Sequence, residues 1–188
     1  MLQVRNIEKY YGTGGNVTKA LDRVSFTVER GEFIAIMGAS GSGKTTLLNC
    51  IATIDTVSAG DILLDGVSLA DLSPRDLAQF RRENLGFVFQ DFNLLDTLTI
   101  GENIALALAI RRTAPQAIDP QVQAMANTLN IGDILDKYPY QVSGGQKQRL
   151  CIARTLLKHP KVLIFDDSTS AVDTATESGI RRALAELT

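Results

Sequence analysis

Residues 38 to 45 read GASGSGKT, and this segment decides the fold class. It satisfies the pattern GxxxxGK[ST], in which glycines let the backbone turn tightly so that its N–H groups converge on phosphate oxygens. Lys44 can neutralise the charge of β- and γ-phosphates, and the Thr45 hydroxyl can coordinate Mg²⁺. The apolar run Phe33–Met37 precedes the segment, and the helix-forming stretch Thr46–Ala52 follows it. The helix adds its positive N-terminal end, so the sequence predicts a phosphate-binding P-loop.

A pair of acids ends a second apolar run, in the stretch VLIFDD at residues 162 to 167. The carboxyl end of a buried strand opens onto the ligand crevice in α/β sheets, where Asp166 can hold Mg²⁺ through water. Paired acids at a strand end can also simply begin a polar loop, with Asp167 or Ser168 capping a following helix. Taken alone, this stretch leaves both interpretations open.

Strands of two kinds are predicted around the P-loop. Apolar and polar residues alternate in Leu2–Ile7 and Val24–Val28, and Asp65-Gly66 is a hairpin turn signal, so these parts predict an antiparallel sheet. The continuous apolar runs Phe33–Met37 and Val162–Phe165 instead predict central parallel strands that are covered on both faces.

Helices are predicted between the strands. Pro115 and Pro120 are expected to mark the connection between the last two helices, and the region 91–157 is expected to be a mostly helical insertion. The three segments with a helical pattern are Asp76–Arg82, Gly101–Arg111 and Gln121–Leu129.

The composition describes a globular chain of 188 residues with 45% hydrophobic and 21% charged residues. A formal net charge of −2 gives no reason to expect nucleic-acid binding across the whole molecule. Cys50 and Cys151 stand far apart without metal-ligand partners, which favours buried, reduced thiols. The N-terminus has no signal-peptide pattern, and the longest apolar run, Ile104–Ile110, is far shorter than the roughly 20 residues that cross a bilayer. A cytoplasmic protein is expected.

Five ordered motifs resemble those of ABC ATPases across nearly the whole chain. SGGQ at residues 143 to 146 resembles the signature LSGGQ, with Val142 in place of leucine. The P-loop, Gln90 after the expected strand Phe87–Phe89, the signature, the acidic strand end of Asp166 (Walker B) and SAVD at 170 to 173 follow one another in the family's order. The resemblance implies an α/β P-loop NTPase with a RecA-like core, an N-terminal antiparallel β subdomain and a helical ABC-specific subdomain.

The resemblance implies one ABC ATP-binding domain over 1–188, with a core at 1–90 and 158–188 and a mainly helical signature subdomain at 91–157. The family places a switch histidine beyond the SAVD motif, whereas the single histidine here is His159, expected at the surface of a turn. The domain is therefore expected to be incomplete at its C-terminus.

The same resemblance assigns the site residues. An aromatic residue near the N-terminus stacks on adenine, and Tyr11 is the better candidate and Tyr10 the second; the alternative is that the tyrosine only packs the sheet edge. The catalytic residues are expected to be Asp167, Gln90 and Lys44, and the Mg²⁺ ligands Thr45, Gln90 and Asp166. The ATP-binding residues are expected to be Tyr11, Gly38, Ser40, Gly41, Ser42, Gly43, Lys44, Thr45, Thr46, Ser143, Gly144, Gly145, Gln146 and Asp173.

Partners follow from the signature. Ser143 and the glycines after it are expected to form a second phosphate-binding helix terminus, which in the family closes over the ATP of a partner ATPase domain in a head-to-tail dimer. The segment Asp91–Leu95 matches the place where a transmembrane permease docks, although packing inside the helical subdomain could account for part of its apolar character. The expected location is the inner face of the cell membrane, and no nucleic-acid partner is expected.

The resemblance implies that the chain is the ATP-hydrolysing subunit of a transporter, and it favours export of the substrate over import. Residues 20 to 111 resemble ATPases of antimicrobial-peptide resistance, lipoprotein release and macrolide efflux, which work with a separate permease. From Ser143 onward the chain is more similar to multidrug exporters whose ATPase is fused to the membrane domain.

One departure from the family affects hydrolysis. Active members carry glutamate after the Walker B aspartate, but this chain has Asp167 followed by Ser168. A carboxylate that is one methylene shorter predicts weak hydrolysis, because misplacement of about 1 Å can lower a rate about a hundredfold. The alternative function is a nucleotide-gated dimerisation module that closes on ATP with little turnover. A soluble ABC protein of DNA repair or translation is disfavoured, because the sequence has neither a long coiled-coil insertion nor tandem ATPase domains.

Overall fold

The computed structural model describes residues 1–13, 16–89 and 91–166. The chain divides into two compact units, Met1–Arg81 and Arg82–Thr188. Helix α2 (Pro74–Asn84) contains the boundary between them.

An antiparallel sheet forms the frame of the first unit, as the alternating sequence predicts. Its strand order is β2-β1-β3-β4, and β1 pairs with both β2 and β3. Leu2, Val4 and Ile7 of β1 point to the buried face. The strands are β1 (Leu2–Tyr11), β2 (Thr18–Val28), β3 (Ala59–Leu64) and β4 (Val67–Ser68).

The predicted hairpin turn joins β3 to β4. Asp65 has φ 50° and Gly66 has φ 83°, so both central residues of the two-residue loop lie in the left-handed region. A two-residue hairpin needs this backbone, and Asp-Gly supplies it at low strain. The turn prediction is confirmed.

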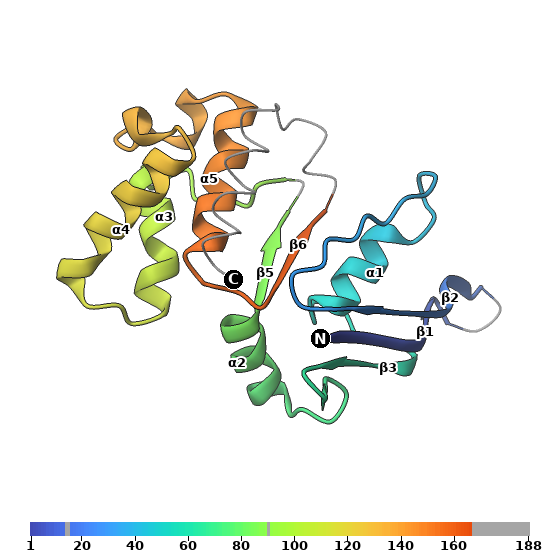
Figure 1. Cartoon of the computed structure of the whole chain (residues 1–188). Helices are drawn as coiled ribbons and strands as arrows, with labels where there is room; N and C mark the ends of the chain where they lie inside the picture. The colour runs from blue at the N-terminus through green and yellow to red at the C-terminus, as the bar shows by residue number, and fades with distance from the viewer. Residues whose placement is uncertain (14–15, 90, 167–188) are drawn as a thin grey trace. The chain divides into compact units, whose positions relative to one another are not determined.

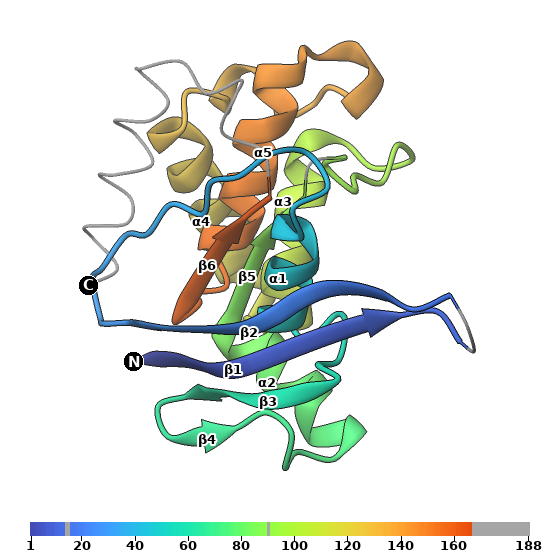
Figure 2. The same ribbon diagram turned by 90° about the vertical axis from the view of Figure 1, so that its right-hand side faces the viewer.

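Helix α1 (Lys44–Ile51) lies over one face of this sheet, near β1 and β2 (Figures 1 and 2). Its buried side chains are Leu47, Cys50 and Ile51, which recur at helical spacing. Cys50 is a free thiol, and so is Cys151 of the second unit, which is also buried. The predictions of a helix after the P-loop and of buried reduced thiols are confirmed.

The prediction of a buried strand at Phe33–Met37 is wrong. The structure assigns no strand to these residues, and Phe33 and Met37 are 79% and 90% exposed. A strand needs neighbouring backbone to complete its hydrogen bonds, and no ladder among the described residues includes this segment. An apolar run reports that a segment is suited to burial, but it does not supply the neighbour that buries it.

The second unit contains a parallel strand pair. Strands β5 (Leu85–Val88) and β6 (Val162–Phe165) pair in register from Leu85 with Val162 to Val88 with Phe165. The predicted parallel character of residues 162 to 165 is confirmed, and β5 begins two residues before the strand expected at Phe87–Phe89. His159 lies exposed in the turn before β6, as predicted.

Three helices provide most of the core of the second unit. Ile100, Ile104 and Leu108 form a buried stripe on α3 and pack with Leu150 and Ile152 of α5. Figure 1 shows α3 beside both α4 and α5. The helices are α3 (Ile100–Ile110), α4 (Pro115–Thr128) and α5 (Gly144–Leu156), with short 3₁₀ turns at Gly132–Ile134 and Pro139–Gln141.

The prediction that Pro115 and Pro120 mark a connection is wrong, because both prolines lie in α4. Pro115 is the first residue of the helix, where its fixed φ fits and no N–H is needed. Pro120 lies inside the helix at an exposed position, where water can satisfy the carbonyl that its missing N–H leaves unpaired. Pro115 therefore starts the helix rather than ending one, and α4 continues through Pro120.

Candidate functional site

The P-loop backbone turns sharply before α1. Gly41 has φ 77° and Gly43 has φ 89°, and the N–H of Ser42 donates to the carbonyl oxygen of Ala39 at 3.2 Å. Gly43 is the N-cap of α1 and has no side chain to occupy the first N–H groups of the helix. The loop therefore presents backbone donors and the positive end of a helix to an anion.

The loop packs directly against strand β2. A Cβ at Gly43 would lie 2.5 Å from the carbonyl oxygen of Ala20, and one at Gly38 would lie 2.6 Å from Oγ of Ser42. The Ala20 oxygen is backbone and cannot rotate away, so Gly43 accepts no larger residue without a shift of β2, whereas the Ser42 hydroxyl can move aside at Gly38. The packing of the loop against β2 therefore helps to determine the shape of the loop.

Lys44 folds back over the loop. Its Nζ donates to the carbonyl oxygens of Gly38 at 2.9 Å and Ala39 at 3.0 Å. The ammonium group is therefore held within the loop itself. Thr45 and Thr46 follow in the first turn of α1, with Thr45 exposed and Thr46 half-buried. The predicted phosphate-binding residues 38 to 46 form one continuous structure.

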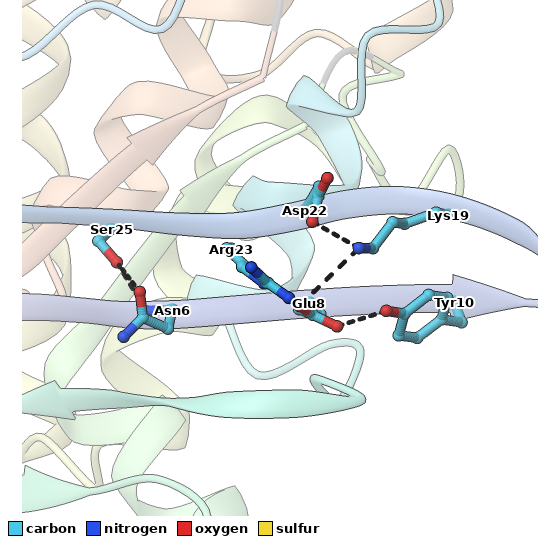
Figure 3. Close-up of polar contacts among 7 residues, drawn as sticks. All are labelled: Asn6, Glu8, Tyr10, Lys19, Asp22, Arg23 and Ser25. Atoms are coloured by element: carbon cyan, nitrogen blue, oxygen red, sulfur yellow. Dashed lines mark hydrogen bonds and ion pairs between the residues drawn. The ribbon is translucent and has the colours of Figure 1, made fainter.

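Tyr10 and Tyr11 lie on opposite faces of β1. Figure 3 shows the hydroxyl of Tyr10 directed at Glu8, which also contacts Lys19 and Arg23 on the exposed face of the sheet. Tyr11 shares its face with the buried residues of β1, and its hydroxyl donates to Asp55 at 2.6 Å. The Tyr11 hydroxyl also interacts with Thr46 of α1. Of the two candidates, only Tyr11 contacts the P-loop helix in these interactions.

The signature residues begin α5. Ser143 is the N-cap, its Oγ accepts from the N–H of Gln146 at 3.3 Å, and the side chain of Gln146 accepts from the N–H of Ser143 at 2.9 Å. This reciprocal pair is a capping box, and the S-x-x-Q spacing of residues 143 to 146 is its sequence signal. Gly144 and Gly145 have open space where a Cβ would stand. The N-terminus of α5 is therefore stable and accessible.

Asp166 follows β6 at the position expected for a Walker B aspartate. It is 8% exposed, and its N–H donates to the carbonyl oxygen of Val88 at 3.1 Å, which prolongs the pairing of β6 with β5. Gln90, Asp167 and Asp173 lie outside the described residues.

The described residues contain no group of three or more histidine, cysteine or acidic side chains that could hold a metal ion. Mg²⁺ is usually bound through one or two protein oxygens, several waters and the phosphates of a substrate. A hydroxyl at Thr45 and a carboxylate at Asp166 are oxygen donors of the required kind.

The segment after Gln90 combines exposure with internal packing. Phe92 and Leu94 pack partly against the core of the second unit, whereas Leu95 is 49% exposed. Arg154 of α5 donates to the carbonyl oxygens of Asn93 at 2.9 Å and Phe92 at 3.1 Å. No pattern in the sequence predicts this link between the segment and the signature helix.

In the part of the chain that the structure describes, none of the helices has the length and apolar character needed to cross a membrane.

Comparison with known proteins agrees with this geometry. The model of the ABC transporter family matches residues 21–170. The bacitracin export ATP-binding protein BceA of Halalkalibacterium halodurans is 46% identical over 187 residues, which cover 100% of this chain and 74% of that protein. The ABC transporter ATP-binding protein YxdL of Bacillus subtilis is 47% identical over 188 residues, covering 100% of this chain and 72% of that protein.

A solved structure shows the same fold. The dimeric post-hydrolysis structure of the ATP-binding cassette MJ0796 bound to ADP and Pi has a TM-score of 0.90 and 36% sequence identity, covering 100% of this chain and 82% of that chain. The predicted P-loop NTPase fold is therefore confirmed. The chain belongs to the ABC transporter family, as an ATPase subunit built on the ATP-binding cassette.

Proposed function

We propose that this chain binds MgATP in the P-loop and drives an export transporter by pairing head to tail with a second ATPase domain. The observation that carries the proposal is the structure of the loop at residues 38 to 45. Two of its glycines have left-handed backbone, no side chain caps the helix that follows, and the Lys44 ammonium is bound to carbonyl oxygens of the loop. The similarity to a bacitracin export protein supports export. A separate permease at the inner face of the cell membrane is the proposed partner.

Each part of the site has a distinct task. The loop N–H groups and Lys44 bind the phosphates, and Tyr11 offers its ring to adenine. Thr45, Asp166 and Gln90 are assigned to Mg²⁺, which neutralises phosphate charge when it is bound. Asp167, aided by Gln90, orients the attacking water, and Asp173 belongs to the dimer contact.

The exposed N-terminus of α5 supports the head-to-tail arrangement. Ser143 and Gly144 are exposed, and a Cβ at Gly144 or Gly145 would meet no heavy atom within 4 Å. A phosphate carried by another molecule can therefore approach this helix end closely. The solved relative MJ0796 is itself described as dimeric.

The pairing is tested with a matched pair of variants at Ser143. Aspartate and asparagine both cap helices about as well as serine, so neither change should reduce the free energy of unfolding by more than about 0.5 kcal/mol. Aspartate adds a negative charge where the partner's γ-phosphate approaches. We expect wild type and Ser143→Asn to dimerise with ATP in sedimentation velocity, whereas Ser143→Asp binds ATP as a monomer.

Dimerisation of Ser143→Asp as strong as that of wild type would contradict the head-to-tail contact. Failure of the wild type to bind ATP at all would contradict the proposed function itself. The experiment is done with ATP and Mg²⁺ against ADP and Mg²⁺, because only ATP carries the γ-phosphate that joins the two domains.

The sequence favours a second candidate, a dimerisation module with little hydrolysis, because Asp167 stands where glutamate is usual. If the shorter carboxylate limits the rate, Asp167→Glu should raise single-turnover ATP hydrolysis by about tenfold to a hundredfold while ATP affinity stays constant. The measurement is phosphate release with the membrane partner present, and Asp167→Asn serves as the control that lacks a base. An unchanged hydrolysis rate in Asp167→Glu would show that the length of the carboxylate side chain does not limit turnover.

A further inference from the structure

A partly buried ion pair lies next to Tyr11 at the end of β1. The Nζ of Lys9 donates to Oδ1 of Asp55 at 2.6 Å and to the carbonyl oxygen of Thr56 at 2.7 Å, and the Lys9 side chain is only 10% exposed. The other carboxylate oxygen of Asp55 accepts from the hydroxyl of Tyr11 at 2.6 Å. One carboxylate therefore holds both the lysine and the tyrosine.

Lys9 also covers one face of the Tyr11 ring. Its Nζ lies 5.0 Å from the ring centroid, within the range of a cation–π interaction. Tyr11 is nevertheless 43% exposed. With the ammonium on one face, the opposite face of the ring is the one left for a planar ligand.

Asp55 is itself fixed to the P-loop helix. Its N–H donates to the carbonyl oxygen of Asn49 at 3.2 Å, and its Oδ1 accepts from the N–H of Thr56 at 2.7 Å. The Tyr11 hydroxyl also interacts with the side chain of Thr46 in the first turn of the same helix. Contacts near both ends of α1 thus determine where the tyrosine ring stands relative to the P-loop.

We propose that Asp55, anchored by Lys9, is a positioning residue that holds the Tyr11 ring ready for the purine base before the nucleotide arrives. The inference rests on the proposed function, in which Tyr11 stacks on adenine. A ring that is already fixed loses little conformational freedom when the base binds, so more of the stacking energy appears as affinity.

The charges in this cluster persist at neutral pH. Burial acts to raise the pKa of Asp55, but the hydrogen bonds from Lys9 and Tyr11 outweigh it and the pKa lies below its ordinary value. The hydrogen bond to Asp55 raises the pKa of Lys9 and also that of Tyr11. The stabilisation is lost only as pH falls through the lowered pKa of Asp55 or rises through the raised pKa of Lys9.

The test compares a ligand that has a base with one that has none. MgATP and magnesium tripolyphosphate both use the P-loop, but only ATP can use the ring. Tyr11→Phe removes the hydroxyl and keeps the ring together with the Lys9–Asp55 pair, and Asp55→Asn removes the charge. We expect each variant to raise the Kd for MgATP about fivefold to tenfold and to change the Kd for tripolyphosphate by less than about twofold.

Glu8→Gln is the matched control. Glu8 accepts a hydrogen bond from Tyr10 on the opposite face of β1, so it reproduces the tyrosine–carboxylate pair away from α1 (Figure 3). It should leave both dissociation constants unchanged. Isothermal titration of the full chain measures them directly, and a melting curve for each variant reports the fold.

Equal weakening of both ligands, or no change for ATP in Tyr11→Phe, would overturn the positioning role. Tyr11→Phe decides the matter alone if Asp55→Asn does not fold, since it keeps the Lys9–Asp55 ion pair. Tyr11→Ala separates this inference from the proposed function: if it too leaves ATP affinity unchanged, the adenine assignment of Tyr11 has failed as well. A wild-type chain that binds neither ligand would instead contradict the P-loop function.

Discussion

Replacing Lys44 with alanine is expected to raise the Kd for MgATP by about a hundredfold or more and to abolish hydrolysis. The ammonium is held by the carbonyl oxygens of Gly38 and Ala39, within the loop that is proposed to bind the phosphates. Hydrogen bonds to charged groups contribute about 1.5–3 kcal/mol each, and a lysine can make more than one to the β- and γ-phosphates. Titration with MgATP and single-turnover phosphate release measure the two effects.

The fold should survive this change. Lys44 is half-buried and its two hydrogen bonds run to loop carbonyls that water can also satisfy, so the free energy of unfolding should fall by no more than about 1 kcal/mol. Lys137→Ala, which removes an exposed lysine of the second unit, is the control for the loss of one positive charge. Binding of MgATP by Lys44→Ala as tight as that of wild type would contradict the phosphate role of the lysine.

Local signals predicted the parts of the fold that depend on neighbouring residues. The Asp65-Gly66 turn, the helix after the P-loop and the alternating strands of the first sheet all follow from the backbone preferences of a few consecutive residues. The strand prediction for Phe33–Met37 is wrong because it depends on a distant part of the chain. A strand is completed by hydrogen bonds to distant backbone, and an apolar pattern contains no information about that partner.

The candidate site was predictable where a motif fixes the geometry. The glycine positions of the P-loop and the N-cap at Ser143 follow from the sequence, because left-handed backbone and helix capping are local requirements. The Lys9–Asp55 pair was not predicted, since its members stand 46 residues apart. A weak signal did exist: Lys9 precedes Tyr11 by two residues, and residues at that spacing in a strand share a face.

Gly43→Ala is expected to reduce the free energy of unfolding by about 3 kcal/mol or more, and to weaken MgATP binding. Two causes combine at this position. Alanine at φ 89° is strained by about 1–2 kcal/mol, and its Cβ would stand 2.5 Å from the carbonyl oxygen of Ala20, which is backbone and cannot rotate away. Relief requires α1 to move away from β2, and this displaces the N–H groups that Gly43 places at the helix start.

Gly41→Ala separates these two causes within the same loop. Gly41 has φ 77°, and a Cβ there would meet no heavy atom within 4 Å, so the strain remains but the collision with β2 is absent. This variant should lose only about 1–2 kcal/mol in urea unfolding. Equal losses in the two variants would show that backbone strain alone accounts for the glycine at 43. A much larger loss of unfolding free energy in Gly43→Ala, together with weaker MgATP binding, would show that the close approach of the P-loop to β2 determines the shape of the loop.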